Sequence, residues 1–426
     1  MDRRRFVTTS VAGIMGAGAG AEASALTGAE TWSGAQLQQD GPGRQSIRAQ
    51  FPRLKDEIYL NAAGGTPLGA FAEEGIRKYL DYIRLGPGDG RRAYFDEVWT
   101  GVRGRFAALV GADESEIGLV GCTKAGEQIV IDRLEALRRG GNVVTNDMHF
   151  SGSLHNYEGL RRSGLDVRVV RARDFDVALD RMAEAMDDRT ALVAVSLVSN
   201  VNGRIEPVAE LSRLAHERGA LLFADIIQAV GAIPVDLHAM GVDVAAASSY
   251  KWLFGTHGAG FLYVRDEVQG TALPDRIFPG HVRRNYAQWV EEPEPGVGDY
   301  RYSAPSGALR YQPGHVSYLG YAAVYEALGF LEQVGGAEAV QAHSTALVAR
   351  LLDGIDTDAY RALTPDPGRS TILALQPASM DGLTDRLAAA NVAISVGGDM
   401  DRMIRISPAI YNSEADIDRL VEVLNG

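Results

Sequence analysis

Short apolar runs alternate along most of the chain with longer amphipathic stretches. The runs are typical of buried strands, and the stretches between them have the spacing of helices. Such alternation predicts an α/β fold in which helices cover both faces of a mainly parallel sheet. The predicted strands are residues 117–120, 143–145, 167–170, 192–196, 221–224, 244–247 and 260–264, with helices that include 126–138, 177–186 and 208–218.

Apolar spacing outside this region indicates how the chain divides into domains. Helical spacing covers residues 71–84 and 95–110 before the first strand, and residues 318–333 after the last one. We expect a large domain over residues 51–335 and a smaller α+β domain over residues 336–426. The N-terminal segment of the large domain is a candidate to pack on the small one.

Residues 281–314 differ from the rest in their many Pro, Gly, Arg and aromatic positions. A connection of this length without regular periodicity is uncommon unless it has a function. We therefore expect a functional loop here.

The first residues have the features of an export signal. Arg3-Arg4-Arg5-Phe6 precedes a weakly apolar stretch over residues 7–21, and Ala23-Ser24-Ala25 is a small-x-small cleavage site. The twin arginine resembles the bacterial twin-arginine signal, so we expect a signal peptide over residues 1–25 and a periplasmic or extracellular protein. A disordered basic start on a cytoplasmic enzyme is the alternative. The stretch is too short and too rich in glycine for a permanent membrane span.

Residues 26–50 are polar and rich in Gly, Gln, Ser and Ala, which predicts a linker between signal and fold. The formal net charge is -13, with no basic run past the N-terminus, so nucleic acid is not an expected partner. A single cysteine, Cys122, excludes an intramolecular disulfide and a zinc site made of cysteines. We expect no metal.

The candidate chemistry begins at Lys251, which follows an apolar run and has aromatic and aliphatic neighbours. Burial disfavours the charge of a lysine, and a neutral amine can form an imine with an aldehyde. Gly255, Gly258 and Gly260 permit the backbone to approach a ligand closely.

Polar residues at the ends of other predicted strands complete a constellation. Asp225 and Gln228 follow one strand, and Asn200 follows the strand before it. Ligands bind at the carboxyl ends of parallel strands, so these side chains should meet there. Asp225 could keep the ring nitrogen of pyridoxal 5'-phosphate (PLP) protonated, and the helix start at Thr123 could hold its phosphate.

Taken together, these motifs resemble the class V aminotransferase family, which includes isopenicillin N epimerases, cysteine desulfurases and carbon–sulfur lyases. The resemblance covers nearly the whole chain after the linker. The matching runs are YLNAA at 59–63, GCTKAG at 121–126, SNVNG at 199–203, DIIQAVGAIPVD at 225–236, SSYKWLFG at 248–255 and RISPAIYN at 405–412.

The resemblance implies PLP-dependent fold type I, an amino-acid substrate and a homodimer whose active sites are shared between subunits. It also implies residue roles. Lys251 carries the Schiff base and moves protons, and Asp225 pairs with the pyridine nitrogen. The phenolic oxygen is bound by Asn200 and Gln228, the phosphate by Thr123, Ser248 and the backbone of Lys124, and the ring is stacked on by His149 (or Phe150). On the substrate side, Arg405 binds the substrate carboxylate, and the site is lined by Asn61 and Ala62.

Two departures from the family pattern affect these assignments. Tyr250 precedes the lysine where many relatives have His, beside the cofactor. Relatives also use a Thr to reach the phosphate of the partner subunit, and here the stretch is Gly314-His315-Val316-Ser317, so His315 or Ser317 is the candidate.

The sequence is compatible with several reactions at the substrate Cα. Desulfurases need a thiolate shortly before the carboxylate-binding arginine, but residues 395–399 contain no cysteine and Cys122 lies in the phosphate cradle. Amino transfer, epimerisation and β-elimination of a sulfur group remain, and the YLNAA and RISPAIYN runs most resemble epimerases. We expect an epimerase-like enzyme or an aminotransferase, with a carbon–sulfur lyase as the alternative. The alternative that is not an enzyme is a binding protein that keeps the PLP fold but has lost catalysis. A nicotinamide-dependent enzyme is disfavoured, because no G-x-G-x-x-G motif follows the first predicted strand.

Overall fold

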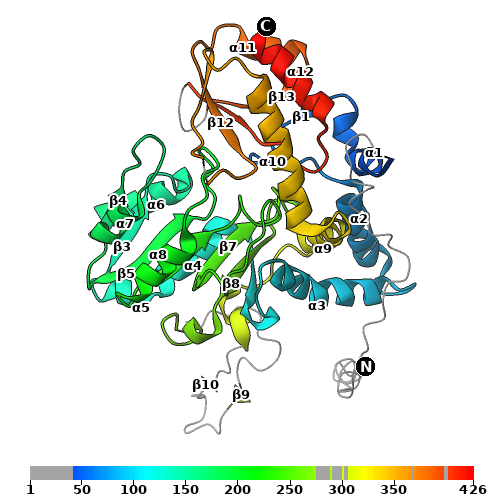
Figure 1. Cartoon of the computed structure of the whole chain (residues 1–426). Helices are drawn as coiled ribbons and strands as arrows, with labels where there is room; N and C mark the ends of the chain where they lie inside the picture. Colours follow the sequence, from blue (N-terminus) through cyan, green and yellow to red (C-terminus); the bar gives the residue numbers. More distant parts are fainter. Residues whose placement is uncertain (1–41, 275–287, 290–299, 302–305, 367, 398–401) are drawn as a thin grey trace.

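The computed structural model describes residues 42–274, 288–289, 300–301, 306–366, 368–397 and 402–426. A seven-stranded sheet with the order β2-β8-β7-β6-β5-β3-β4 forms its centre (Figure 1). Every strand except β8 runs in the same direction. The strands are β2 (Ile117–Val120), β3 (Asn142–Asn146), β4 (Val167–Val170), β5 (Thr190–Ser196), β6 (Leu221–Asp225), β7 (Val244–Ser248) and β8 (Gly260–Val264). The predicted α/β fold with a mainly parallel sheet is confirmed.

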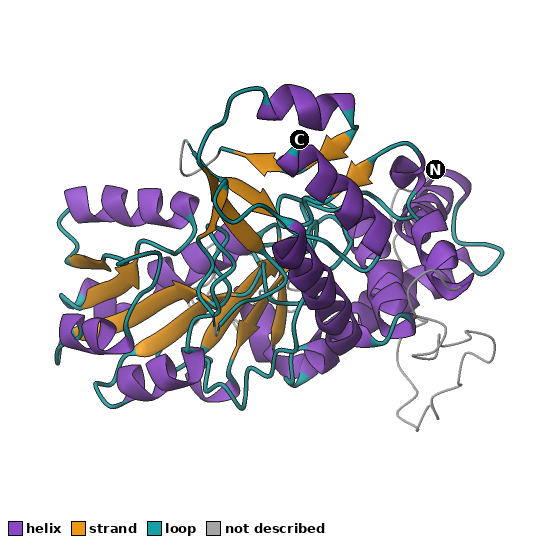
Figure 2. Cartoon of the chain, turned by 45° about the horizontal axis from the view of Figure 1, so that its top comes forward, coloured by secondary structure: helices purple, strands orange, loops and turns teal. Residues whose placement is uncertain are grey.

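Helices cover both faces of this sheet (Figure 2). The whole of β5 is buried, with Val193 and Val195 in one apolar cluster and Leu192 and Ala194 in the other. This two-sided burial explains why the strands appear in the sequence as continuous apolar runs. The covering helices are α4 (Thr123–Arg133), α5 (Glu135–Arg138), α6 (Ser151–Arg162), α7 (Leu179–Ala185) and α8 (Val208–His216), with short 3-10 turns η3 (Glu114–Glu116) and η4 (Asp266–Val268) between elements.

The predicted helix over residues 126–138 is two helices. Leu134 has extended backbone dihedral angles (φ -65°, ψ 101°) between α4 and α5. Its side chain is buried in the apolar cluster of this face, so packing favours the break over a continuous helix.

Three long helices pack beside the sheet, as their apolar spacing predicts. They are α2 (Ala70–Leu85), α3 (Arg91–Leu109) and α9 (Tyr318–Gln333). The closest approach is at Gly75, where a Cβ atom would lie 2.3 Å from the carbonyl oxygen of Ala322. Glycine is therefore required for α2 to lie against α9 at this distance.

The C-terminal region forms a second, smaller unit above the large sheet (Figure 1). Its antiparallel sheet has the order β11-β12-β15-β14. Leu347, Leu375, Ile404 and Leu420 belong to an apolar cluster of its own. The elements are α10 (Gly336–Gly354), β11 (Tyr360–Ala362), β12 (Leu373–Pro377), α11 (Leu383–Ala389), β13 (Val392–Ala393), β14 (Ser395–Val396), β15 (Ile404–Ile406) and α12 (Glu414–Asn425).

The N-terminal segment packs against this smaller unit. Strand β1 (Ile58–Tyr59) pairs in parallel with β13, and Leu60 belongs to the same apolar cluster. The segment starts with α1 (Pro42–Ala49) and the turn η2 (Pro52–Lys55). The predicted linker over residues 26–50 is therefore wrong at its end, because Ile47 in α1 is fully buried and anchors the helix in the core.

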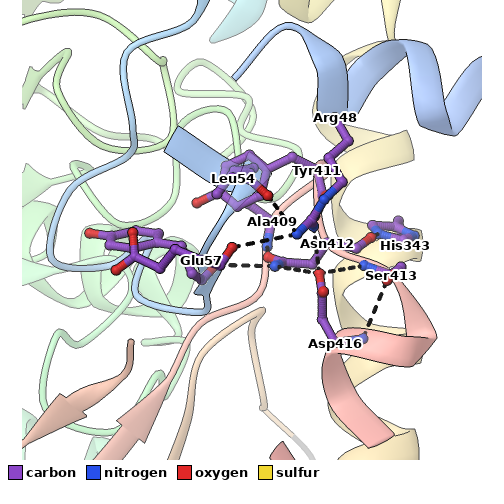
Figure 3. Close-up of polar contacts among 10 residues, drawn as sticks. Arg48, Leu54, Glu57, His343, Ala409, Tyr411, Asn412, Ser413 and Asp416 are labelled. Atoms are coloured by element: carbon purple, nitrogen blue, oxygen red, sulfur yellow. Dashed lines mark hydrogen bonds and ion pairs between the residues drawn. The ribbon is translucent and has the colours of Figure 1, made fainter. Parts of the chain in front are cut away.

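Arg48 joins this segment to the C-terminal end of the chain (Figure 3). Its guanidinium donates to Asp416 Oδ2 at 2.8 Å, and to the carbonyl oxygens of Leu54 at 3.0 Å and Tyr411 at 3.3 Å. Asn412 Nδ2 donates to the carbonyl oxygen of Tyr59 at 3.0 Å. Side-chain hydrogen bonds thus link the segment at residues 48–59 to the C-terminal region at residues 411–416.

Several predictions fall outside the described residues. These are the signal peptide over residues 1–25, the linker up to residue 41 and most of the loop over residues 281–314, of which β9 (Gln288–Trp289), β10 (Tyr300–Arg301) and η5 (Gly307–Tyr311) are described. Among the helices that are described, none is both long and apolar enough to cross a membrane.

Candidate active site

The predicted catalytic residues gather at the carboxyl edge of the large sheet. Ser196 and Asp225 end the neighbouring strands β5 and β6 and lie opposite each other in register. His149 follows β3, and Lys251 follows β7. Parallel strands bring their carboxyl ends to one edge, so residues far apart in the sequence meet here.

Lys251 is a buried amine in a low-dielectric setting. Its side chain is largely removed from solvent, with 7% of the residue exposed. Burial lowers the pKa of Lys251 to about 8; the charge of Asp225 opposes this shift and the charge of Arg405 adds to it. A sizeable fraction of the amine is therefore neutral near physiological pH, which makes it a nucleophile for an aldehyde.

Contacts with the backbone hold the turn that carries Lys251. Thr66 Oγ1 donates to the carbonyl oxygen of Lys251 at 2.8 Å, and the N–H of Phe254 donates to the same oxygen at 2.9 Å. Phe254 is fully buried and adopts a left-handed φ of 54°, a conformation unfavourable for a bulky residue. Tight packing maintains this backbone conformation and positions the amine.

Asp225 is the buried acid of the site. Its Oδ1 accepts a hydrogen bond from the N–H of Ile227 at 3.0 Å. Burial raises the pKa of Asp225, while the charges of His149 and Lys251 act in the opposite direction. A cationic ring nitrogen beside this carboxylate would stabilise its charged form.

Gln228 and Asn200, the predicted ligands of the phenolic oxygen, also connect parts of the site. Gln228 Nε2 donates to the carbonyl oxygen of Ala63 at 2.9 Å, and its Oε1 accepts from the indole N–H of Trp252 at 2.9 Å. The carbonyl oxygen of Asn200 accepts from Arg405 Nη1 at 2.5 Å. Both residues thus link the cofactor side to segments expected to bind substrate.

The predicted phosphate cradle lies at the start of α4. The hydroxyls of Thr123 and Ser248 are 3.1 Å apart, and each also accepts a hydrogen bond from the other's backbone N–H at 2.9 Å. Lys124 directs its amine away, to the carbonyl oxygen of Gly152 at 3.0 Å. Its backbone N–H is in the first turn, where amides have no partner within the helix. The cradle therefore consists of hydroxyls and backbone amides.

His149 is the better candidate of the two for stacking on the cofactor ring. Its Nδ1 lies 2.8 Å from Ser196 Oγ at the edge of the sheet. Phe150 instead packs against the first turn of α6. The contact is close, since a Cβ atom placed on Gly152 would lie 2.6 Å from Phe150 Cε1.

Glu127 is a site residue that the sequence interpretation missed. Its Oε1 lies 3.3 Å from His149 Nε2, and the residue is 1% exposed. The helical spacing of the sequence could have indicated this, because Glu127 lies on the same buried face of α4 as Thr123, Val130 and Ile131. A glutamate on the apolar face of a helix is uncommon without a partner.

The substrate side is assembled from two segments far apart in the sequence, at residues 61–62 and 405–407. Asn61 forms a β-bridge with Ser407, two residues after Arg405. The N–H of Ala62 donates to the carbonyl oxygen of Ser407 at 3.1 Å. Asn61 Oδ1 is buried and has no hydrogen-bond partner among the described residues, as expected of a group that faces a polar ligand.

Tyr250 and the two candidates for a cross-subunit ligand have contacts of their own. The ring of Tyr250 stacks on His257, with centroids 4.0 Å apart, and its own centroid is 5.7 Å from the Lys251 amine. Ser317 Oγ caps α9 by accepting from the N–H of Gly320 at 3.1 Å. His315 is exposed and lies 3.0 Å from the hydroxyl of Tyr318. His315 is therefore the better candidate for contacting another subunit.

Cys122 is the N-cap residue of α4 and directly precedes Thr123 of the predicted phosphate cradle. Across the described ranges, the structure contains no group of three or more His, Cys, Asp or Glu side chains with the arrangement of a metal site.

The donor set fits one cofactor. A buried amine of lowered pKa, a buried carboxylate beside it, an imidazole and a helix start with two hydroxyls match the aldehyde, ring nitrogen, ring face and phosphate of PLP. With the doubly covered parallel sheet, they define a PLP-dependent enzyme of fold type I.

The chain belongs to the class V aminotransferase family, because the family model "Aminotransferase class-V" matches residues 88–420. A "Probable cysteine desulfurase" of Methanothermobacter thermautotrophicus is 28% identical over 322 residues, which cover 73% of this chain and 77% of the relative. The solved cysteine desulfurase CsdA of Escherichia coli is 20% identical over 89% of this chain and 97% of its own, with a TM-score of 0.75. The cystine C–S lyase C-DES, solved with cysteine persulfide, is 20% identical over 88% of this chain and 99% of its own, with a TM-score of 0.75.

Proposed function

We propose that the protein removes the Cα proton of a free amino acid with the Lys251 amine and then releases a β-substituent bound through sulfur. It would thus act as a PLP-dependent carbon–sulfur lyase. The observation that supports proton removal is the burial of Lys251, which lowers its pKa to about 8 while the charges of Asp225 and Arg405 act on the amine in opposite directions. A base with a pKa near the working pH is the most effective in proton transfer.

Each residue has a distinct part in this reaction. Bound PLP supplies an electron sink, because its protonated ring accepts the electron pair left at Cα. Asp225 would keep the ring nitrogen protonated. Arg405 would hold the substrate carboxylate with a bidentate pair, and Asn61 would orient the substrate from the opposite segment.

The absence of a suitable thiol supports elimination over sulfur transfer onto the protein. The chain has one cysteine, Cys122, at the start of α4 beside Thr123. A thiol there lies at the expected phosphate and not on the segment before Arg405. The sulfur product would therefore leave into solution. The names of the relatives, cysteine desulfurase and cystine C–S lyase, support a sulfur-containing substrate.

A second candidate is epimerisation or amino transfer at Cα. What supports it is the resemblance of the runs at residues 59–63 and 405–412 to epimerases; these runs are in contact, since Ser407 Oγ accepts from the N–H of Ala63 at 2.9 Å. These reactions begin with the same proton removal and differ in where the proton returns.

A panel of amino acids, incubated with the purified PLP-loaded protein, separates these reactions. Release of a keto acid and ammonia, with sulfide from cysteine or cysteine persulfide from cystine, supports the lyase. A racemised amino acid, or a keto acid formed without ammonia, indicates the second candidate. No product from any amino acid, together with no cofactor absorbance, would indicate a binding protein without activity.

We also propose a homodimer with active sites at the subunit interface. Of the large apolar side chains that are exposed in the described ranges, Leu68, Leu80, Ile83 and Leu85 lie close together in sequence, in and just before α2. Leu80, Ile83 and Leu85 lie in the C-terminal part of α2, and exposed apolar side chains grouped on one helix are a candidate for an interface. Sedimentation should give a dimer, and a fully active monomer would contradict the proposal.

Export through the twin-arginine route is the proposed localisation. Replacing Arg3 and Arg4 with Lys should retain the protein in the cytoplasmic fraction. An unchanged distribution between fractions would favour the cytoplasmic alternative.

A further inference from the structure

A buried carboxylate lies next to the imidazole that is expected to face the cofactor. Glu127 projects from the buried face of α4, with its Oε1 3.3 Å from His149 Nε2. Its Oε2 accepts from Ser153 Oγ at 2.6 Å and from Lys124 Nζ at 3.3 Å. All four groups come from α4, α6 and the loop between β3 and α6.

His149 in turn connects Glu127 with the edge of the sheet. Its Nδ1 lies 2.8 Å from the hydroxyl of Ser196, whose neighbour in register on β6 is Asp225. Both ring nitrogens are therefore engaged. An ionised carboxylate only accepts hydrogen bonds, so Nε2 must carry a proton while Glu127 is charged.

The balance of interactions keeps Glu127 charged. Burial raises the pKa of Glu127, but hydrogen bonding with His149, its charge, the charge of Lys124 and the Ser153 hydroxyl together lower the pKa to about 2. The carboxylate is thus ionised throughout the neutral range. The charge of His149 also acts on the pKa of Asp225, lowering it against burial.

We propose that Glu127 is a positioning residue that fixes the orientation and the Nε2 proton of His149, and through this ring sets the electrostatic field at Asp225. The part that concerns the cofactor rests on the proposed function. The coupling of Glu127 to His149 does not, because it exists in the protein without PLP.

The fold contains a matched pair that serves as a control. Glu116 is also a buried glutamate, 2% exposed, and its Oε2 lies 2.6 Å from His238 Nε2. This pair belongs to η3 and the segment after β6, and neither residue contacts His149, Asp225 or Lys251 in the described structure. Glu116→Gln therefore removes the same charge from a buried glutamate outside the site, although its partner His238 is more exposed than His149.

The test is an NMR titration of the imidazole protons in cofactor-free protein. The chain has 8 histidines, so the signal of His149 is identified by its loss in His149→Asn. The charged or titratable groups that face this ring are Glu127, Asp225, Tyr157 and, beyond Glu127, Lys124. Glu127→Gln removes a negative charge, so the His149 midpoint should fall by about one pH unit or more.

Two further variants keep the test decisive if Glu127→Gln folds poorly. Lys124→Met removes a positive charge near Glu127, so the His149 midpoint should rise. Glu116→Gln should leave it unchanged. An unchanged midpoint in Glu127→Gln, or shifts of the same sign in Glu127→Gln and Lys124→Met, would overturn the proposal.

The PLP-loaded protein tests the link to Asp225. The pH dependence of the cofactor absorbance should shift in Glu127→Gln and stay as in wild type in Glu116→Gln. The same titration in both variants and wild type would contradict a field set through His149. A shifted His149 midpoint without product from any amino acid would remove the proposed function and leave the coupling intact.

Discussion

The cofactor half and the substrate half of the site are built in different ways. The cofactor half comes from consecutive parts of one sheet, with Asp225 at the end of β6 and Lys251 just after β7. The substrate half combines Asn61, near the start of the fold, with Ser407 and Arg405, near its end. Local strand geometry positions the first half, whereas the second half requires two segments more than 300 residues apart in the sequence to meet.

This difference determines which property a substitution in each half should change. Groups at strand ends are fixed by the hydrogen-bonded sheet and by cores on both of its faces. The substrate half depends on links such as Arg48 to Asp416 (Figure 3) and Asn412 to Tyr59. We therefore expect changes in the cofactor half to abolish chemistry, and changes in the substrate half to weaken amino-acid binding.

The largest effect should follow from Lys251→Ala. Loss of the amine removes both the covalent attachment of PLP and the base, so kcat should fall by about 10³-fold or more. In the cofactor-free protein thermal stability should not decrease, because a buried amine with a lowered pKa is removed. The PLP-loaded protein should lose the stability that the attached cofactor supplies. Steady-state kinetics and thermal unfolding measure the two effects, and retention of near wild-type kcat would contradict the assignment.

The pH dependence of cofactor attachment should be the next largest effect. Only the neutral amine attacks an aldehyde, and the pKa of Lys251 is about 8. The rate at which PLP becomes attached to cofactor-free protein should rise with pH up to about 8 and fall about tenfold per unit below it. Stopped-flow absorbance measures this rate. A midpoint near the usual lysine pKa would mean that burial does not tune the amine.

Arg405→Ala should mainly affect the substrate half. Loss of a charge-assisted bidentate pair costs about 2 kcal/mol, so KM for the amino acid should rise about 30-fold. The affinity for PLP should remain as in wild type. Arg402→Ala is the control, because Arg402 is an exposed arginine in the same segment. Equal effects in both variants would remove Arg405 from the site.

Arg48→Met should have the smallest effect on catalysis, and it tests whether the substrate half can be perturbed without the cofactor half. The ion pair with Asp416 is partly exposed, so its loss should cost no more than about 1 kcal/mol. KM should rise a few-fold with kcat unchanged, because Arg48 holds the segment that carries Asn61. Arg53→Met, which removes an exposed pair with Glu57, is the control. A lower kcat without a change in KM would show that the two halves are not separable.

The sequence predicts the cofactor half better than the substrate half for a physical reason. Strand ends can be located from apolar runs, so Asp225 and Lys251 are predictable as neighbours before the structure is seen. The helix α1 and the anchoring of Arg48 depend on contacts with residues more than 300 positions away, which local patterns do not contain. Glu127 was missed because its partner, His149, lies on a different element, and the break at Leu134 was missed because packing overrides helix periodicity.

Trapping the cofactor on the protein tests the central claim most directly. The PLP-loaded protein would be reduced with borohydride, digested and analysed by mass spectrometry. The account predicts a single phosphopyridoxyl adduct on the peptide that contains Lys251. An adduct on another lysine, or none after reduction of a protein that binds PLP, would contradict it.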